Sequence, residues 1–232
     1  MSENHKKHLE RQLWNIADAL RSKMNADEYR NYILGFIFFK YLSERMLDFA
    51  NEQLQRAPIT SYNEVPEDES TEEGKRYMET MRQKALKTLG YFLKPSQLFS
   101  TLVARGMSQG TSTEVNEDEE VPADNFILED LRDVLRYIEN STQGTDSEKD
   151  FINLFQDINL DSVKLGRSVE ARNKIIVDVL RNLSKIDFRL DDVDSDVLGD
   201  AYEYLIGEFA SGAGKKAGEF YTPHESPSLT WM

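Results

Sequence analysis

The sequence of 232 residues contains no cysteine and only three histidines. The absence of cysteine excludes disulfide bonds and zinc sites built on thiolates, and it is compatible with a reducing compartment. His5 and His8 have helical spacing, but no carboxylate is spaced to complete a metal site with them, so we expect solvated side chains near a chain end. His224 has no identifiable acid to orient it. We therefore predict neither a metal site nor a Ser-His-Asp triad.

Positive charge is also scarce. The chain has 28 Lys and Arg residues against 42 Asp and Glu residues, which gives a formal net charge of −14. Sequence-independent DNA affinity comes from Lys and Arg side chains that neutralise phosphates, so this balance is unfavourable for wrapping nucleic acid. A direct DNA-binding domain is therefore disfavoured. If DNA is bound, we expect another domain or subunit to make most of the backbone contacts.

No apolar stretch is long enough for a membrane span. The longest is YILGFIFFKYL, Tyr32 to Leu42, which Gly35 and Lys40 interrupt. A bilayer span needs roughly 20 apolar residues. The N-terminal sequence MSENHKKHLERQLW has no apolar signal core, which argues against export. We expect a cytoplasmic protein without a membrane span.

What the sequence does have is a succession of apolar residues at helical spacing. Hydrophobic residues make up 39% and charged residues 30%, as expected of a globular protein. A capping pair, Asn25 and Glu28, predicts the start of a helix that runs to about Phe49. This helix is apolar nearly all round at 33–39, which predicts a position at the centre of the domain. The fold class is predicted to be all-α and multi-helical, with further helices at 9–20, 76–89, 95–106, 126–138, 151–158, 171–183 and 195–210.

Two polar stretches predict loops between these helices. Residues 58–74 are polar and acidic. Residues 106–124, GMSQGTSTEVNEDEEVPAD, have the composition of a mobile acidic loop. A solvated insertion is favoured over an interaction tail, because this stretch contains no aromatic anchor. Alternating patterns typical of strands are few, and the best strand candidate is 219–222.

The stretch GAGKK near the end of the sequence partly matches a phosphate-binding loop. That motif requires two glycines five positions apart, followed by Lys and then by Ser or Thr. With Gly214 and Lys215 as anchors, the earlier glycine would stand at the position of Phe209. Lys216 occupies the place of the hydroxyl residue, and the preceding segment is predicted to be a helix rather than a strand. We therefore exclude a P-loop.

A longer stretch carries a specific resemblance to a known family. DSDVLGDAYEYLIGEFASGAGKKAGEFYTPHE, residues 194–225, looks like the junction in the modification subunits of type I restriction–modification systems. Members of this family are DNA adenine-N6 methyltransferases that use S-adenosylmethionine. Upstream, LWNIADALR, YILGFIFFKYLSERM and RNKIIVDVLRNLSKIDF are similar to the helical N-terminal domain of that family. The resemblance covers nearly the whole chain, and the combination LGDAYEYL…GKKAGEFYTP is highly specific.

By this resemblance, the Phe-Tyr-Thr-Pro segment is the first cofactor-contacting motif. An extended segment offers backbone amides and carbonyls to the amino-acid end of S-adenosylmethionine, and an aromatic ring suits its sulfonium cation. A hydroxyl can donate or accept a hydrogen bond, and a proline holds the turn without a competing donor. A second interpretation stays open, in which the aromatic rings plug a hydrophobic face of the helical domain. The residues implied in cofactor binding are Glu219, Phe220, Tyr221, Thr222, Pro223 and His224.

Three glycines around Lys215 and Lys216 predict a flexible joint. This joint fits a hinge between a helical and a catalytic domain, with a lysine near DNA. A simple exposed linker is the favoured interpretation of the two lysines, because the surrounding composition is that of a loop. The resulting domain limits are 1–210 for the helical N-terminal domain, 211–218 for the hinge and 219–232 for the start of a truncated methyltransferase domain.

The resemblance also indicates what the chain lacks. In the family, an Asn-Pro-Pro-aromatic motif holds the amino group of a flipped adenine. The six prolines here include no adjacent pair, so that motif is missing, as is the glycine-rich cofactor loop. SPSLTWM stands where a Val and an apolar helix are expected, an end that a shortened gene, a proteolytic fragment or a frameshift would produce. We assign no catalytic residue, and we expect this chain alone to be inactive and to bind S-adenosylmethionine weakly or not at all.

The resemblance implies a set of partners as well. They are the specificity subunit, a second modification subunit and the restriction subunit of the same system, with DNA bound through the full complex. The chain would then serve assembly and contribute the first cofactor-contacting motif. The alternative is a stand-alone helical module that binds protein and has no catalytic relative, which the acidic composition and the missing motifs fit equally well.

Overall fold

The described part of the chain is helical. A computed structural model describes residues 3–21, 23–55, 59, 61–108 and 127–188, together with 197, 199–201, 203–205 and 207, and no strand occurs among these residues. The predicted all-α class is therefore confirmed. The helices are α1 (Glu3–Arg21), α2 (Ala26–Leu54), α3 (Glu72–Thr88), α4 (Phe99–Ser108), α5 (Ile127–Ser141), α6 (Glu148–Phe151) and α7 (Val169–Leu183), with 3-10 turns η1 (Tyr62–Glu64) and η2 (Pro95–Gln97).

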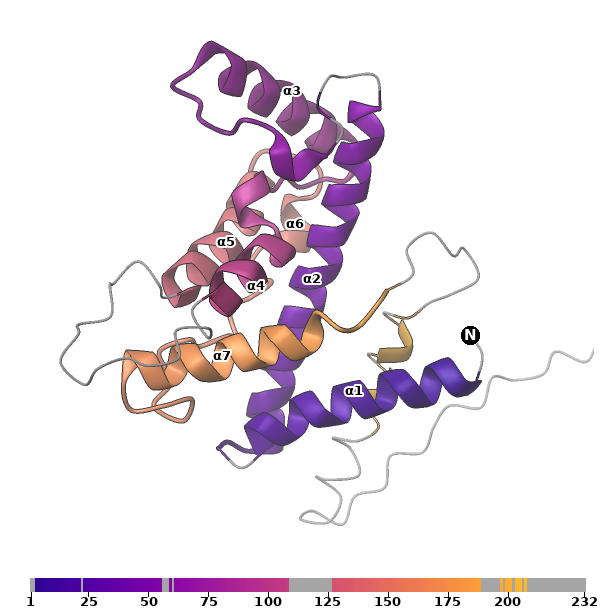
Figure 1. Cartoon of the computed structure of the whole chain (residues 1–232), viewed down its shortest axis with the longest axis vertical. Coiled ribbons are helices and arrows are strands. Elements are labelled where there is room, and N and C mark those ends of the chain that lie inside the picture. Colours follow the sequence, from indigo (N-terminus) through magenta and orange to yellow (C-terminus); the bar gives the residue numbers. More distant parts are fainter. Residues whose placement is uncertain are drawn as a thin grey trace, which may run out of the picture.

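Helix α2 forms the centre of the structure, as predicted. It contacts α1, α3, α4 and α7, which surround it in Figure 1. The predicted capping box is present, because the Glu28 amide donates to Asn25 Oδ1 at 3.0 Å and the Asn25 amide donates to Glu28 Oε2 at 3.3 Å. Ile33, Phe36 and Phe39 are fully buried, so the all-round apolar stretch packs against neighbours on several sides.

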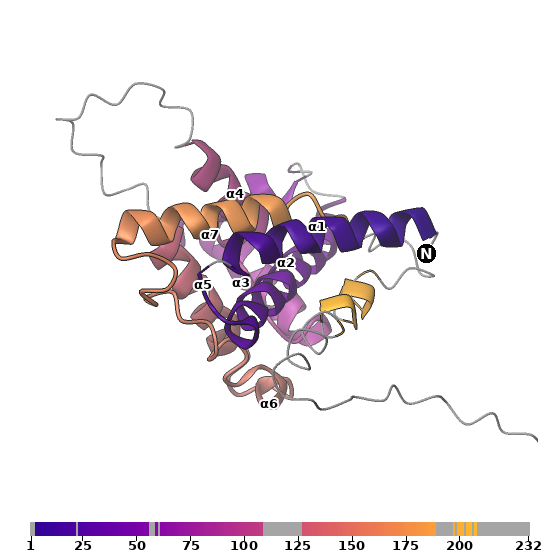
Figure 2. The ribbon, with the colours of Figure 1, turned by 90° about the horizontal axis from the view of Figure 1, so that it is seen from below.

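Helices α1 and α7 lie against each other and against the same end of α2 (Figures 1 and 2). Leu13, Ile16 and Leu20 of α1 are fully buried, in agreement with the helix predicted for 9–20. The Gln12 side chain donates from Nε2 to the carbonyl of Lys185 at 3.0 Å, just after α7. The N-terminal helix is thereby fixed to the segment that leaves α7.

Helix α3 begins at Glu72 rather than near residue 76. Thr71 is the reason, because its Oγ1 accepts a hydrogen bond from the Gly74 amide at 3.1 Å and so caps the first turn. Gly74 lies so close to the loop that a Cβ would stand 2.2 Å from the Asp68 carbonyl oxygen. Only glycine fits there. The helix ends before Gly90, as predicted, and Gly90 takes the left-handed conformation with φ of 84°.

The single helix predicted from Pro95 to Gly106 is divided in two. Pro95 opens the 3-10 turn η2, and the chain is extended at Leu98 (φ −66°, ψ 145°) before α4 begins. The Ser43 hydroxyl of α2 accepts a hydrogen bond from the Phe99 amide at 2.7 Å, which satisfies a donor at the start of α4. This buried contact favours a new helix start at Phe99.

The helix predicted for 151–158 is wrong. Helix α6 ends at Phe151, and hydrogen-bonded turns follow it. Ile152 is extended with ψ of 126°, and Asn153 has a left-handed φ of 59°. The Phe155 amide then donates to the Glu139 carboxylate on α5 at 2.9 Å instead of to a helical carbonyl. The apolar spacing reflects Phe155 and its neighbours packing onto the core from an irregular backbone.

The last predicted helix, 195–210, is described only in part. The described positions between 197 and 207 are helical. Val197, Ala201 and Leu205 recur every four residues and are buried in the same core as α2. Three predictions lie outside the described residues, namely most of the acidic loop at 106–124, the hinge at 211–218 and the strand at 219–222. Within the described ranges, no helix has both the length and the apolar character that a membrane crossing needs.

Candidate functional site

The six residues that the sequence implies in cofactor binding, Glu219 to His224, all lie outside the described residues. Lys215 and Lys216 lie outside them as well, and so do the side chains of His5 and His8. The structure does describe the segment that leads towards the motif. The site is therefore built from the residues that follow α7.

Phe188 attaches the end of α7 to the central helix. Its side chain is buried, and its ring meets the ring of Tyr41 edge to face, with 6.1 Å between the centroids and 78° between the planes. The ammonium of Lys40 lies 4.5 Å from the Phe188 centroid, within reach of a cation–π contact. Figure 1 shows the chain passing beside α2 after α7. These contacts set the direction in which the chain leaves α7.

Lys40 is the least expected residue of this junction, because its side chain is only 2% exposed. It forms an ion pair with Glu44, one turn further along α2, and the Phe99 ring lies 5.9 Å from its ammonium. Burial raises the pKa of Glu44, against the opposing effect of Lys40. We call Lys40, Tyr41, Glu44, Phe99 and Phe188 the Lys40 junction.

In the sequence, Lys40 stands out only because it interrupts an apolar run. A signal for its role was present, since a lysine and a glutamate stand four residues apart on a helix that is apolar nearly all round. On such a helix a charge has no solvent face to occupy, so it needs a buried partner. The contacts of the junction tie α2 to Phe99 and to Phe188, which indicates a positioning role.

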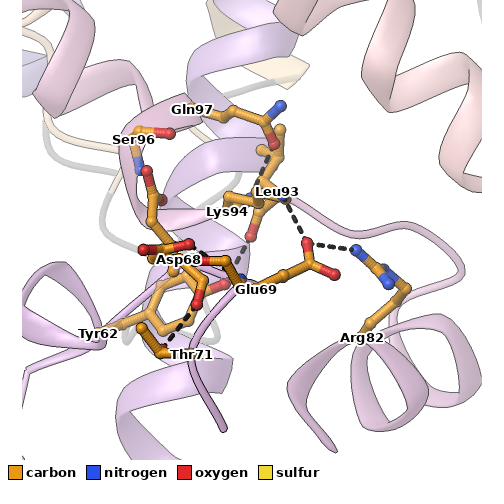
Figure 3. Close-up of polar contacts among 11 residues, drawn as sticks. Tyr62, Asp68, Glu69, Thr71, Arg82, Leu93, Lys94, Ser96 and Gln97 are labelled. Carbon is orange, nitrogen blue, oxygen red and sulfur yellow. Dashed lines mark hydrogen bonds and ion pairs between the residues drawn. The ribbon is translucent and has the colours of Figure 1, made fainter. Parts of the chain in front are cut away.

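A second polar cluster lies near the C-terminal end of α2, beside α3 (Figure 3). Glu69 accepts hydrogen bonds from Lys94 at 2.6 Å and from Arg82 at 3.3 Å. Lys94 and Arg82 hold the pKa of the Glu69 carboxyl below its ordinary value. We call these three residues, with the loops they join, the Glu69 clasp.

The Glu69 clasp extends into the backbone of two loops. The Ser96 amide donates to Glu67 Oε2 at 2.9 Å, and the Lys94 amide donates to Gln97 Oε1 at 2.9 Å. The Tyr62 hydroxyl donates to the Leu93 carbonyl at 2.7 Å, and burial raises the pKa of Tyr62 (Figure 3). These bonds satisfy backbone groups in and just before the 3-10 turn η2, so the clasp fixes the position of this turn.

Two cavities border the stretch between α6 and α7. An apolar groove of about 650 Å³ lies between α2, residues 154–158 and Gly199. A polar pocket of about 270 Å³ lies between α5 and residues 153–161. Among the residues that the structure describes, no group of three His, Asp or Glu side chains is placed to hold a metal ion.

Comparison with protein families divides the chain in two. The family described as HsdM N-terminal domain matches residues 9–183, which span α1 to α7 almost completely. The family described as N-6 DNA Methylase matches residues 193–230, which include the predicted cofactor segment. The first match covers more than half of the chain.

Curated relatives come from a bacterium and an archaeon. The type I restriction enzyme MpnII methylase subunit of Mycoplasma pneumoniae is 31% identical over 95% of this chain and 38% of its own length. The type I restriction enzyme MjaIX methylase subunit of Methanocaldococcus jannaschii is 26% identical over 95% of this chain and 34% of its own length. The chain therefore spans little more than a third of these relatives.

A solved structure has the same fold. The crystal structure of the type I restriction-modification system methyltransferase subunit from Streptococcus thermophilus superposes with a TM-score of 0.68 and 36% identity, over 94% of this chain and 41% of that one. Fold and sequence thus agree over nearly all of the chain, in accord with the predicted resemblance. The chain belongs to the HsdM N-terminal domain family, the helical N-terminal part of type I restriction–modification methyltransferase subunits.

Proposed function

We propose that this chain is the N-terminal part of a subunit that methylates the N6 atom of adenine in DNA, with S-adenosylmethionine as methyl donor. One observation supports this function above the others. The two family matches follow each other directly, with the helical domain at 9–183 and the methylase at 193–230. Relatives of this chain are methyltransferase subunits. That this protein methylates adenine N6, and that S-adenosylmethionine is its methyl donor, is what we propose.

Residues 219–224 serve in this proposal as the first cofactor-contacting segment. The methylase match runs through these residues, which supports their assignment to the methyltransferase rather than to the helical body. The ring of Tyr221 or Phe220 would lie against the sulfonium cation, and the Thr222 hydroxyl would bond the amino-acid end of the donor. S-adenosylmethionine supplies the activated methyl group, and these residues would bind and orient it.

The helical body acts in this proposal as a support and an assembly surface. We expect it to contact the specificity subunit, a second modification subunit and the restriction subunit, with DNA bound through the complex. The net charge of −14 supports such an indirect role towards DNA. The chain alone would lack most of the cofactor pocket and would therefore not transfer methyl groups.

We place the end of the helical domain at residue 210, a hinge at 211–218 and the start of the methyltransferase domain at 219. Burial supports this placement, because Val197, Ala201 and Leu205 lie in the same hydrophobic core as α2. Residues up to at least Leu205 therefore pack with the helical body, although the methylase match begins at residue 193.

The experiment compares two forms of the protein. Residues 1–232 are expected to transfer no radiolabelled methyl group to DNA, whereas the product of the whole gene, purified with its specificity subunit, is expected to do so. In the active form, Tyr221→Ala should raise the KM for S-adenosylmethionine at least about fivefold, since the lost ring contact contributes about 1 kcal/mol or more. Tyr221→Phe, which keeps the ring, is the matched control and should stay close to the wild type.

Three results would count against parts of this proposal. Turnover by residues 1–232 alone would show that the chain needs no further pocket. An unchanged KM in Tyr221→Ala would remove residues 219–224 from the cofactor site. A gene without a glycine-rich loop and an Asn-Pro-Pro-aromatic motif beyond codon 232 would instead support the alternative, a helical module that only binds protein.

A further inference from the structure

The polar pocket beside α5 holds a charged group that the fold does not use. We call it the Arg136 pocket, after the arginine in its wall, and its volume is about 270 Å³. Helix α5 contributes Arg132, Arg136 and Glu139 to the wall, and residues 153–161 close the other side. The stretch between α6 and α7, which lines the pocket, runs along the edge of the ribbon in Figure 2.

The other charged side chains of the pocket already have partners. Arg132 donates to Asp161 Oδ1 at 2.7 Å, and Glu139 Oε1 accepts the Phe155 amide at 2.9 Å. Arg136 differs from them, because no residue that the structure describes forms a hydrogen bond or an ion pair with its guanidinium. A guanidinium carries five N–H donors in a planar fork that matches a carboxylate, so Arg136 offers an open binding group.

The remainder of the lining is partly amide and partly apolar. Asn153 and Gln156 contribute side-chain amides, and Leu135, Leu160 and Phe155 contribute buried apolar groups. This mixture suits a side chain that has a charged tip on an apolar stem. The volume is below the range of roughly 300–1,000 Å³ that is usual for small-molecule sites, and it corresponds to a single side chain.

We propose that the Arg136 pocket binds one Asp or Glu side chain presented by a partner protein. A bidentate bond to Arg136 fixes the carboxylate, and the apolar lining receives its methylene stem. The same stretch exposes Ile152 (62%) and Val163 (73%), apolar side chains that a protein partner would cover and a phosphodiester backbone would not.

The proposal rests on the pocket alone and does not require methyl transfer. The test uses residues 1–232 and NMR signals of the arginine side chains, with the Arg136 signal assigned through Arg136→Lys. The probe is the blocked tripeptide acetyl-Leu-Glu-Leu-amide, added up to about 10 mM, because one anchored side chain gives millimolar affinity. We expect the Arg136 signal to move on addition of this peptide.

A matched peptide tests whether charge is needed for binding, and two variants test whether Arg136 is the binding group. The analogue acetyl-Leu-Gln-Leu-amide should bind at least about fivefold more weakly, since a neutral amide forms weaker bonds to a guanidinium. Arg136→Gln should abolish the shifts that the Glu peptide causes in the backbone amide signals of the pocket stretch 153–161, whereas Arg76→Gln, at an exposed arginine of α3, should leave those shifts unchanged. Unshifted signals elsewhere in the spectrum show that each variant remains folded.

Several outcomes would overturn the proposal. An Arg136 signal that stays fixed throughout the titration would show that the guanidinium binds no carboxylate. An equal response to the Glu and Gln peptides would show that charge plays no part. Tighter binding of inorganic phosphate or of a DNA duplex through Arg136 would assign the pocket to phosphate instead.

Discussion

Two lysine–glutamate pairs, one in the middle of α2 and one beside α3, behave in opposite ways. In the Lys40 junction the lysine is buried, and burial raises the pKa of Glu44. In the Glu69 clasp both partners are partly exposed, and the cations lower the pKa of Glu69. The carboxylate is therefore disfavoured at Glu44 and favoured at Glu69, although each glutamate is paired with a lysine. At Glu44 the desolvation of the carboxylate raises the pKa more than the neighbouring Lys40 lowers it.

The two pairs also differ in what they join. The Glu69 clasp holds together two loops beside α3, and all its groups lie between residues 62 and 97. The Lys40 junction joins α2 to Phe99 at the start of α4 and to Phe188 after α7. Because the junction connects segments far apart in sequence and its lysine is buried, we expect its loss to lower the free energy of unfolding more than loss of the clasp.

The largest effect is expected from Phe188→Ala. Removing a buried ring that packs on Tyr41 and Lys40 leaves a cavity, and the free energy of unfolding should fall by about 4 kcal/mol. Urea unfolding followed by circular dichroism measures it. Ile152→Ala is the control, because its exposed side chain should change stability by less than about 0.5 kcal/mol. Equal effects of the two variants would contradict the account of the junction.

Lys40→Met should have the next largest effect. The ammonium is lost and the Glu44 carboxylate remains in a partly buried site without its partner, so the free energy of unfolding should fall by about 3 kcal/mol. The double variant Lys40→Met with Glu44→Gln should recover much of this loss, because no unpaired charge remains. A double variant no more stable than Lys40→Met would show that packing, rather than the unpaired carboxylate, causes the loss.

Lys94→Met tests the partly exposed pair Lys94–Glu69 with the same lysine-to-methionine change. Solvent screens this pair, so the free energy of unfolding should fall by only about 0.5 kcal/mol. The difference from the wild type should shrink further in about 1 M salt, where the Debye length is about 3 Å. A loss as large as that of Lys40→Met would erase the distinction between the two regions.

The smallest expected effect is a difference in pH dependence. The folded-state pKa of Glu69 lies below its ordinary value of 4.5, so its stabilisation is present above pH 4.5 and is lost as pH falls through the lower folded value. The folded-state pKa of Glu44 lies above 4.5, so its ionisation costs stability as pH rises through that higher value. Urea unfolding of Glu69→Gln and Glu44→Gln over this range should give slopes of opposite sign relative to the wild type. Slopes of the same sign would refute the assignment.

Much of the fold could be predicted from local sequence. The capping pair Asn25 and Glu28 and the apolar spacing of α1, α2, α5 and α7 are properties of neighbouring residues. These four helices were predicted, and all four are present. The helix predicted for 151–158 failed because apolar spacing cannot distinguish a helix from turns that bury the same side chains. At Asn153 the backbone turns left-handed, and the Phe155 amide bonds Glu139 on another helix.

The contacts between segments that are distant in sequence could not be predicted from the pattern of neighbouring residues. The clasp depends on Glu69 meeting Lys94, 25 residues away, and the junction depends on Phe188 reaching α2. Neither contact follows from periodicity. The predicted cofactor segment at 219–224 came from a motif rather than from packing, and its contacts stay a prediction because these residues lie outside the described ranges.

The central claim is that this chain belongs to an enzyme that places methyl groups on adenine N6 in DNA. The most direct measurement is mapping of N6-methyladenine by sequencing genomic DNA from the source cell, before and after deletion of the gene. We predict that deletion removes N6-methyladenine from one sequence context and that expression of the intact gene restores it. An unchanged pattern of adenine methylation, in cells that also express the specificity subunit, would contradict the account.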